Sequence, residues 1–169
     1  MDKILPAGEE ATTLIRDLAE DTWKVCYRDM ISADQIDYML EMMYSRDSLL
    51  QQMEEGIRFV IHYIHDVPTG FAGFGPKKDD PSVWRLEKLY VLPKMQKRGS
   101  GRLLLEAVEL AALAGKAQQL ELNVNRKNNA VAFYKRAGFM ISREEDIDIG
   151  GGFFMNDYIM RKDLVGKID

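Results

Sequence analysis

The sequence predicts a single mixed α/β domain. Helical patterns occupy the first third of the chain, and strand patterns then alternate with helical ones to its end. A length of 169 residues suits one domain, and 46% hydrophobic with 30% charged residues is a globular balance. No internal repeat, low-complexity tract or linker divides the chain, so residues 1–169 are expected to form one domain.

Three helices are predicted before the first strand. The first carries apolar residues near helical spacing at Leu14, Ile15, Leu18, Trp23, Val25 and Met30. Ser32 and Gln35 then resemble a capping box, in which the Ser32 hydroxyl accepts from the Gln35 amide and the Gln35 side chain reaches back. A second helix follows, with Ile36, Met39, Leu40 and Met43 on one face. Residues 47–53 predict a third, short helix.

Two strands and a turn between them form a predicted hairpin. Residues 58–64 are rich in β-branched and aromatic side chains. Residues 66–70 supply turn chemistry, with Pro68 and Gly70, and residues 70–74 predict the returning strand. A further strand is predicted over residues 84–91, and it ends at Pro93 because proline cannot donate to a strand ladder.

The second half of the chain predicts two more helices and two more strands. A long helix follows residues 99–101 and ends near Gly115. Leu120, Leu122 and Val124 alternate with polar residues, as in a half-buried strand. Residues 130–136 predict a short helix ended by Gly138. Residues 153–160 predict the last strand, after three consecutive glycines.

Composition argues against several classes of protein. The net charge is −4 with both signs interspersed, which disfavours binding to nucleic acid. No apolar stretch approaches the roughly 20 residues that span a bilayer, and no signal-peptide pattern opens the chain. Cys26 is the single cysteine, which excludes an intrachain disulfide and suits the cytoplasm. No cluster of His, Cys or carboxylates has ligand spacing, so we expect no metal.

The most informative segment is a basic loop between a predicted strand and the long helix. It reads Gln96-Lys97-Arg98-Gly99-Ser100-Gly101-Arg102. Backbone N–H groups at a helix start, glycines that allow close approach and three basic side chains suit a pyrophosphate. The alternative is a plain strand–turn–helix connection with a solvated basic turn. The loop matches neither the Walker A pattern nor the dinucleotide fingerprint, because Leu104 replaces the third glycine of the latter.

Two motifs together resemble the GNAT family of acetyl-CoA-dependent N-acetyltransferases. Residues 96–101 are similar to its pyrophosphate loop, [QR]-x-x-G-x-[GA], and residues 128–139 resemble its second cofactor motif, which ends in F-Y-x-x-x-G-F. The resemblance implies a central, mostly antiparallel sheet flanked by helices, with acetyl-CoA as cosubstrate. It assigns acetyl-CoA binding to Leu89, Tyr90, Val91, Gln96, Lys97, Arg98, Gly99, Ser100, Gly101, Arg102, Asn128 and Tyr134.

The resemblance also implies direct transfer, in which an amine attacks the thioester and CoA leaves as a thiolate. Tyr134 matches the family's tyrosine near the CoA sulfur and is the predicted acid, with a core aromatic as the alternative. The Val91 N–H is the predicted oxyanion donor. Glu87 is the predicted base, on the expectation that alternation places it on one face with Leu89. The alternative for Glu87 is a surface charge paired with Arg85 or Lys88.

The acceptor is expected to be a small-molecule amine bound by the early helices and the C-terminal segment. Residues 23–27, 37–40 and 156–160 resemble bacterial polyamine acetyltransferases. Aromatic and acidic side chains suit a cation, although tryptophan and tyrosine on amphipathic helices are more often core. The predicted acceptor-binding residues are Trp23, Tyr27, Asn123 and Asp157. Open alternatives are a protein N-terminus or lysine as acceptor, and a non-catalytic acetyl-CoA-binding module. Family members often form dimers, so a homodimer is also an expectation.

Overall fold

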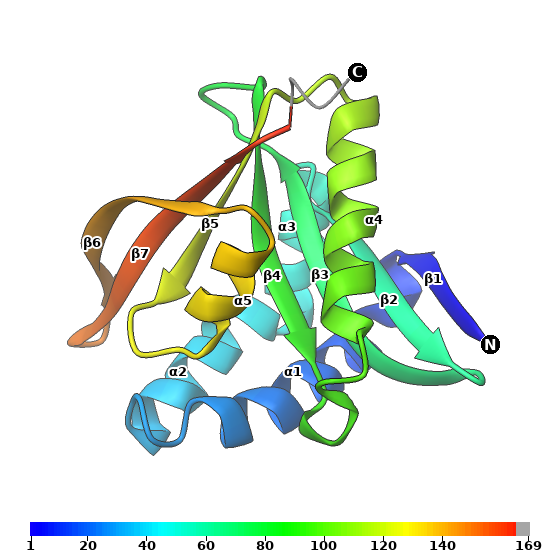
Figure 1. The fold of residues 1–169 in the computed structure, drawn as a ribbon. Coiled ribbons are helices and arrows are strands. Elements are labelled where there is room, and N and C mark those ends of the chain that lie inside the picture. The colour runs from blue at the N-terminus through cyan, green and yellow to red at the C-terminus, as the bar shows by residue number, and fades with distance from the viewer. Residues whose placement is uncertain (165–169) are drawn as a thin grey trace.

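The computed structural model describes residues 1–164, and within this range seven strands form one sheet in the order β1-β2-β3-β4-β5-β7-β6 (Figure 1). Neighbouring strands are antiparallel except β4 and β5, which are parallel. The predicted mixed, mostly antiparallel sheet flanked by helices is confirmed. The elements are β1 (Asp2–Ala7), α1 (Thr12–Cys26), α2 (Ala33–Tyr44), α3 (Arg46–Glu54), β2 (Arg58–Ile64), β3 (Val67–Pro76), β4 (Val83–Val91), α4 (Ser100–Ala114), β5 (Gln119–Asn125), α5 (Ala130–Arg136), β6 (Met140–Gly150) and β7 (Phe153–Asp163).

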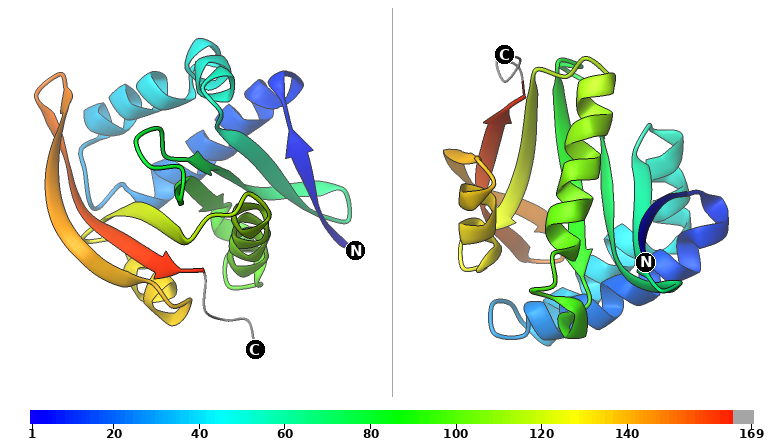
Figure 2. Two further views of the ribbon diagram at one scale, coloured as in Figure 1. Left: turned by 90° about the horizontal axis from the view of Figure 1, so that it is seen from above. Right: turned by 45° about the vertical axis from the view of Figure 1, so that its right-hand side comes forward.

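Helices cover both faces of the sheet, so the strands bury two hydrophobic cores. Seen from above, α1, α2 and α3 lie on one side of the sheet, and α4 and α5 lie on the other (Figure 2). Alternation along β3 sends Phe71 to the α1–α3 side and Ala72 to the α4 side. The α4 side is filled by Leu104, Val108 and Leu120, all fully buried.

The hairpin turn is shorter than predicted. The structure turns at His65 and Asp66, which both have positive φ (48° and 66°), as a two-residue hairpin loop requires. Val67 already pairs with Ile64, so β3 begins inside the predicted turn. Pro68 therefore lies within a strand rather than in the turn, next to an irregularity in the β2–β3 register.

Two strands are absent from the prediction, and both lie at the edges of the sheet. β1 contains Pro6 and only short apolar stretches, and β6 is highly charged. An edge strand buries little of its surface and therefore shows a weak hydrophobic pattern. In β6, Ile147 and Ile149 alternate with exposed acidic or glycine positions, which is the one period-2 signal in that segment.

The predicted cap of α2 is half right. The Ser32 hydroxyl accepts from the Gln35 N–H at 3.0 Å. The Gln35 side chain does not reach back, because its Nε2 donates to the Phe154 carbonyl at 2.8 Å. Gln35 thus ties α2 to β7 across the end of the sheet.

No helix within residues 1–164 has the length and apolar character needed to cross a membrane. That part of the chain also contains no group of three or more His, Cys, Asp or Glu side chains able to hold a metal ion.

Candidate active site

The two parallel strands at the centre of the sheet separate halfway along their length. β4 and β5 pair only through residues 83–86 and 119–122. Leu86 and Lys88 face successive residues of β3, so Glu87 between them has no partner and forms a β-bulge. A bulge bends its strand and increases its twist. The second half of β4 therefore turns away from β5 and leaves an opening in the sheet.

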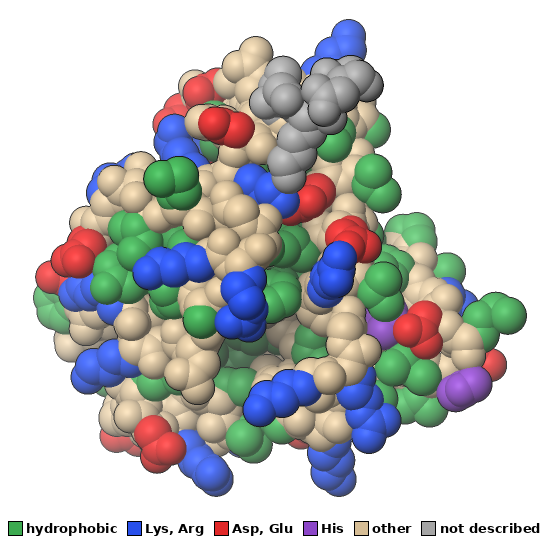
Figure 3. Space-filling view, viewed as in Figure 1, with side chains coloured by type: hydrophobic (Ala, Val, Ile, Leu, Met, Phe, Trp, Pro, Cys, Tyr) green, Lys and Arg blue, Asp and Glu red, His purple; other side chains and the backbone are tan. Residues whose placement is uncertain are grey.

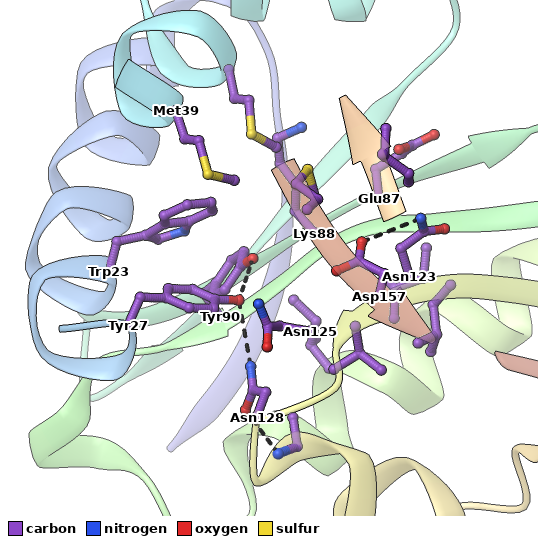
Figure 4. Close-up of a pocket in the computed structure, with 18 of the residues that line it drawn as sticks. Trp23, Tyr27, Met39, Glu87, Lys88, Tyr90, Asn123, Asn125, Asn128 and Asp157 are labelled. Atoms are coloured by element: carbon purple, nitrogen blue, oxygen red, sulfur yellow. Dashed lines mark hydrogen bonds between the residues drawn. The ribbon is translucent and has the colours of Figure 1, made fainter. Parts of the chain in front are cut away.

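A cavity of about 300 Å³ occupies this opening. Its walls come from the diverging halves of β4 and β5, from α1 and α2, and from the start of α5 (Figure 4). The strands β6 and β7 contribute Ile147, Met155 and Asp157. The cavity therefore joins segments that are far apart in the sequence.

The open edge of β4 presents backbone groups to the cavity. Leu92 N donates to Thr69 O at 2.8 Å, so the alternation of the antiparallel ladder directs the peptide groups of Val91 away from β3. Gln96 Nε2 donates to the Val91 carbonyl at 3.0 Å from that open side. By the same alternation, Leu89 also directs its N–H toward the cleft. An extended ligand can therefore hydrogen-bond along this edge as an added strand does.

The basic loop lies at one end of the cleft, where α4 begins. Lys97 (φ 64°) and Gly99 (φ 87°) adopt left-handed conformations, which glycine tolerates without strain. Lys97, Arg98 and Arg102 are exposed, and Figure 3 shows Lys and Arg side chains bordering a hollow below α5, beside this loop.

The buried hydroxyl of Ser100 indicates whether the loop suits an anion. It occupies the first turn of α4, and its hydroxyl is buried without a hydrogen-bond partner within residues 1–164. A buried hydroxyl at a helix start, among unpaired N–H groups, lacks an acceptor. Phosphate oxygens supply such acceptors, so the loop fits the pyrophosphate of a coenzyme.

Tyr134 lies on α5 and contributes to the wall of the cavity. Its side chain is 7% exposed and packs edge-on against Phe133 and Phe139. Burial raises the pKa of its phenol above the usual range. Tyr134 therefore packs as a core aromatic, which was the alternative to a catalytic role. Its phenol also stays protonated and lines the cavity, so it can still act as a proton donor.

Asn128 connects α5 to the helices on the opposite face. Its Oδ1 accepts from Ala130 N at 2.8 Å at the start of α5, and its Nδ2 donates to the Tyr27 hydroxyl at 3.4 Å. The Tyr27 hydroxyl also lies 3.2 Å from the Tyr90 hydroxyl. Burial raises the pKa of Tyr27 to about 12. These hydrogen bonds link Asn128, Tyr27 and Tyr90, which all line the cavity (Figure 4).

Trp23 and Tyr27 belong both to the core and to the cavity wall. Their rings lie 4.6 Å apart and pack with Tyr44 and Tyr90 between α1 and the sheet. Trp23 is 2% exposed and its Nε1 has no partner within residues 1–164. Both residues also line the cavity.

The bulge changes the predicted position of Glu87. Alternation was expected to place Glu87 and Leu89 on one face, and that expectation is wrong. The extra residue leaves Glu87 on the face of Arg85, with Glu87 Oε2 3.5 Å from Arg85 Nε, while Leu89 packs against the α4 core. Glu87 lines the cavity but its side chain remains 33% exposed.

The structure brings Asn123 and Asp157 together as diagonal neighbours on the adjacent strands β5 and β7. Asn123 Nδ2 donates to Asp157 Oδ2 at 3.4 Å, and Asn123 Oδ1 accepts from the Arg85 guanidinium. Asp157 is 2% exposed and lines the cavity. Burial raises the pKa of Asp157, against smaller opposing effects of Asn123, Arg85 and Arg126.

Sequence reasoning missed several cavity residues. Arg85 organises Asn123 and Glu87, but it was considered only as a charge partner of Glu87. Met39, Met43 and Met155 line the cavity rather than merely filling the core. Methionine carries no motif, so no local signal distinguishes a cavity position from a core position.

Comparison with known proteins identifies the family of the chain. The family model of the acetyltransferase (GNAT) domain matches residues 27–155. Spermidine N(1)-acetyltransferase from Thermoplasma acidophilum is 29% identical over 154 residues, covering 87% of this chain and 90% of that protein. The uncharacterized N-acetyltransferase YjcF of Bacillus subtilis is 29% identical over 114 residues, covering 67% of this chain and 78% of that protein.

Solved structures share the fold. PaiA N-acetyltransferase from Thermoplasma acidophilum, solved in complex with coenzyme A, superposes with a TM-score of 0.82 at 23% identity, covering 96% of this chain and 99% of that one. A GCN5-related N-acetyltransferase from Rhodopseudomonas palustris superposes with a TM-score of 0.81 at 21% identity, covering 96% of both chains. The split sheet, the basic loop and the family match lead to one conclusion: the chain belongs to the GNAT acetyltransferase family and is an N-acetyltransferase.

Proposed function

We propose that the protein transfers the acetyl group from acetyl-CoA to a primary amine of a small molecule such as a polyamine, by direct transfer in a ternary complex. The observation that carries this proposal is the cleft between β4 and β5, which has an anion-suited loop at one end and buried acidic and aromatic groups along its wall. The spermidine acetyltransferase of Thermoplasma acidophilum supports the polyamine class. A single cysteine suits the reducing cytoplasm, where we place the reaction.

Acetyl-CoA would bind along the open edge of β4. The pantetheine arm pairs with the backbone of Leu89 and Val91, whereas the peptide groups of Tyr90 between them face β3. The pyrophosphate sits at the start of α4, held by residues 96–102. Asn128 borders the cavity at the start of α5, on the opposite side of the cleft. With acetyl-CoA bound along β4 in this way, its thioester lies beside the Val91 N–H and Tyr134.

The reaction then needs three groups. The amine loses a proton as its nitrogen attacks the thioester carbon, and the Val91 N–H stabilises the developing oxyanion. The C–S bond breaks, and the CoA thiolate takes the Tyr134 proton. Two carboxylates of the cavity, Glu87 and Asp157, are available to receive the amine proton.

A narrow acceptor is favoured because α2 and the β6–β7 hairpin, which both line the cavity, are joined by direct contacts. Tyr38 on α2 donates to the Ile149 carbonyl at 2.9 Å, and its ring lies 5.3 Å from that of Phe153. Gln35 makes a second connection from α2 to β7. These contacts hold α2 against the β6–β7 hairpin and limit the space between them for a bulky acceptor. A slender amine passes more readily than a protein terminus.

The test is CoA release from acetyl-CoA with a panel of spermidine, spermine, amino acids, aminoglycosides and short peptides. We expect turnover with linear polyamines. Turnover with peptides alone would shift the acceptor class to protein amines. No turnover with any amine, together with a melting temperature still raised by CoA, would indicate a non-catalytic coenzyme-binding module.

Replacing Lys97, Arg98 and Arg102 by alanine is expected to raise the KM for acetyl-CoA roughly 10-fold while leaving the amine KM near its original value. The increase is expected because these side chains are exposed beside the pyrophosphate site. Steady-state kinetics at low and high salt measures it, and the wild type is expected to be the more salt-sensitive protein. Lys78→Ala, an exposed lysine outside the loop, is the control. An unchanged acetyl-CoA KM would show that this loop does not bind the phosphates.

A further inference from the structure

Asp157 stands out among the acidic residues of the cavity. It lies on β7 opposite Asn125 and is 2% exposed, yet it lines the cavity. Its single polar side-chain contact within residues 1–164 is the 3.4 Å hydrogen bond from Asn123. A buried carboxylate normally has a cation or several donors as partners, because its desolvation is costly.

The nearby cations are directed elsewhere. Arg85 bonds the Asn123 amide oxygen and pairs with Glu87. Arg126 pairs with Asp146 at 2.6 Å and reaches only the backbone carbonyl of Asp157. Within residues 1–164, Asp157 therefore forms no ion pair. A cationic ligand in the cavity would supply the partner that this buried carboxylate lacks.

Glu87 is differently placed, although it borders the same cavity. Its side chain is a third exposed and is already paired with Arg85. An exposed, paired carboxylate gains little from one more cation. Asp157, being buried and unpaired, gains much more from an ammonium group.

We propose that Asp157, rather than Glu87, binds the reacting ammonium of the acceptor and takes its proton. This inference rests on the proposed acetyltransfer to an amine. The ammonium binds the Asp157 carboxylate and passes one proton to it, directly or through water. The nitrogen lone pair then forms the N–C bond. As the C–S bond breaks, Tyr134 gives its proton to the CoA thiolate, and the Tyr134 phenolate takes the second amine proton through water. The Asp157 proton returns to solvent after product release.

Asn123 acts as a positioning residue for Asp157. Its Oδ1 is held by Arg85, which orients its Nδ2 toward Asp157 Oδ2. One carboxylate oxygen is thereby occupied, and the other is left for the substrate. The remaining titratable groups of the cavity and its surroundings are Glu87 and Lys88 from β4, Glu145 from β6, Arg126 after β5, and the phenols of Tyr27, Tyr90 and Tyr134. Lys88 donates to Gln52, and burial lowers its pKa to about 8.

The test compares Asp157→Asn with Glu87→Gln, using the amine that the wild type acetylates best. Asp157→Asn is expected to lower kcat/KM for the amine roughly 100-fold, as loss of a general base does, while the Kd for acetyl-CoA stays within about 2-fold. Glu87→Gln is expected to lower it less than about 5-fold. Glu144→Gln on exposed β6, which removes the same charge, is the control for a nonspecific electrostatic effect.

The pH profile separates a proton acceptor from a structural residue. Activity of the wild type falls as pH decreases through the Asp157 pKa, because the protonated carboxyl neither binds an ammonium nor takes a proton. Asp157→Asn is expected to lose this acidic limb, whereas Glu87→Gln keeps it. Because a raised carboxyl pKa disfavours the folded state above that pKa, Asp157→Asn should also melt no lower than the wild type at pH 8.

The outcomes are distinguishable. If the wild type acetylates no amine, the proposed function itself fails. If the wild type is active and Asp157→Asn retains its kcat/KM and its acidic limb, the assignment of Asp157 is wrong. A larger loss in Glu87→Gln would return the role to Glu87. A lower melting temperature in Asp157→Asn with an unchanged pH profile would make Asp157 a structural residue.

Discussion

Tyr134→Phe is expected to lower kcat about 100-fold, because general-acid catalysis typically contributes 10²–10⁴. The phenol is buried beside the cavity, and burial raises its pKa above the usual range, so it stays protonated at every working pH. Phenylalanine retains the packing against Phe133 and Phe139 and removes only the proton that the thiolate would take. Steady-state kinetics with saturating amine measures kcat and the acetyl-CoA KM separately. The KM should change less than kcat.

Tyr63→Phe is the matched control for this change. Tyr63 lies on β2, packs on the α1–α3 side and does not line the cavity. Tyr63→Phe should leave kcat and the acetyl-CoA KM near those of the wild type. A Tyr134→Phe enzyme with full kcat would remove Tyr134 from the mechanism and leave it as a core aromatic. The rate should recover in part with an acetyl donor whose thiol leaving group has a lower pKa, because a weaker base needs less protonation.

The loop between β4 and α4 could be predicted from the sequence because its information is local. Residues 96–102 lie between one strand and one helix. Glycine, serine and basic residues at fixed spacing determine the backbone conformation and the charge of this loop. The structure places Gln96 and Ser100 where a local pattern suggests. The pattern does not reveal that Gln96 holds the Val91 carbonyl, because that contact depends on how the loop folds back.

The acceptor side could be predicted only in part, because its residues meet across the sheet. Asn123 and Asp157 are 34 positions apart and become neighbours only when β7 inserts between β5 and β6. The predicted face of Glu87 was wrong because a bulge shifts the alternation of side chains by one residue. No residue type in β4 indicates that a bulge is present. β1 and β6 were missed for the opposite reason, since edge strands need little hydrophobic pattern.

Gly70→Ala is expected to damage both stability and acetyl-CoA binding. Gly70 lies on β3 opposite Val91, and a Cβ there would stand 2.4 Å from the Tyr90 carbonyl oxygen and 3.0 Å from the Val91 Cα. The obstructing atoms are backbone, so relief requires β3 and β4 to move apart. Overpacking of this kind costs about 3 kcal/mol in the free energy of unfolding, which lowers Tm by roughly 10 °C in a domain of this size.

The functional consequence follows from what the displaced segment does. Val91 belongs to the open edge that we assign to the pantetheine arm and the oxyanion, and Tyr90 directly precedes it. A shift of a few tenths of an ångström in this segment misaligns the ligand with both. Acetyl-CoA binding by calorimetry should therefore weaken even at temperatures where the variant is fully folded. Gly8→Ala is the matched control, because its new Cβ would meet only the flexible end of Glu10. A Gly70→Ala protein that melts and binds acetyl-CoA like Gly8→Ala would show that this edge of β4 tolerates displacement, and the backbone of Val91 would then be a poor candidate for stabilising the oxyanion.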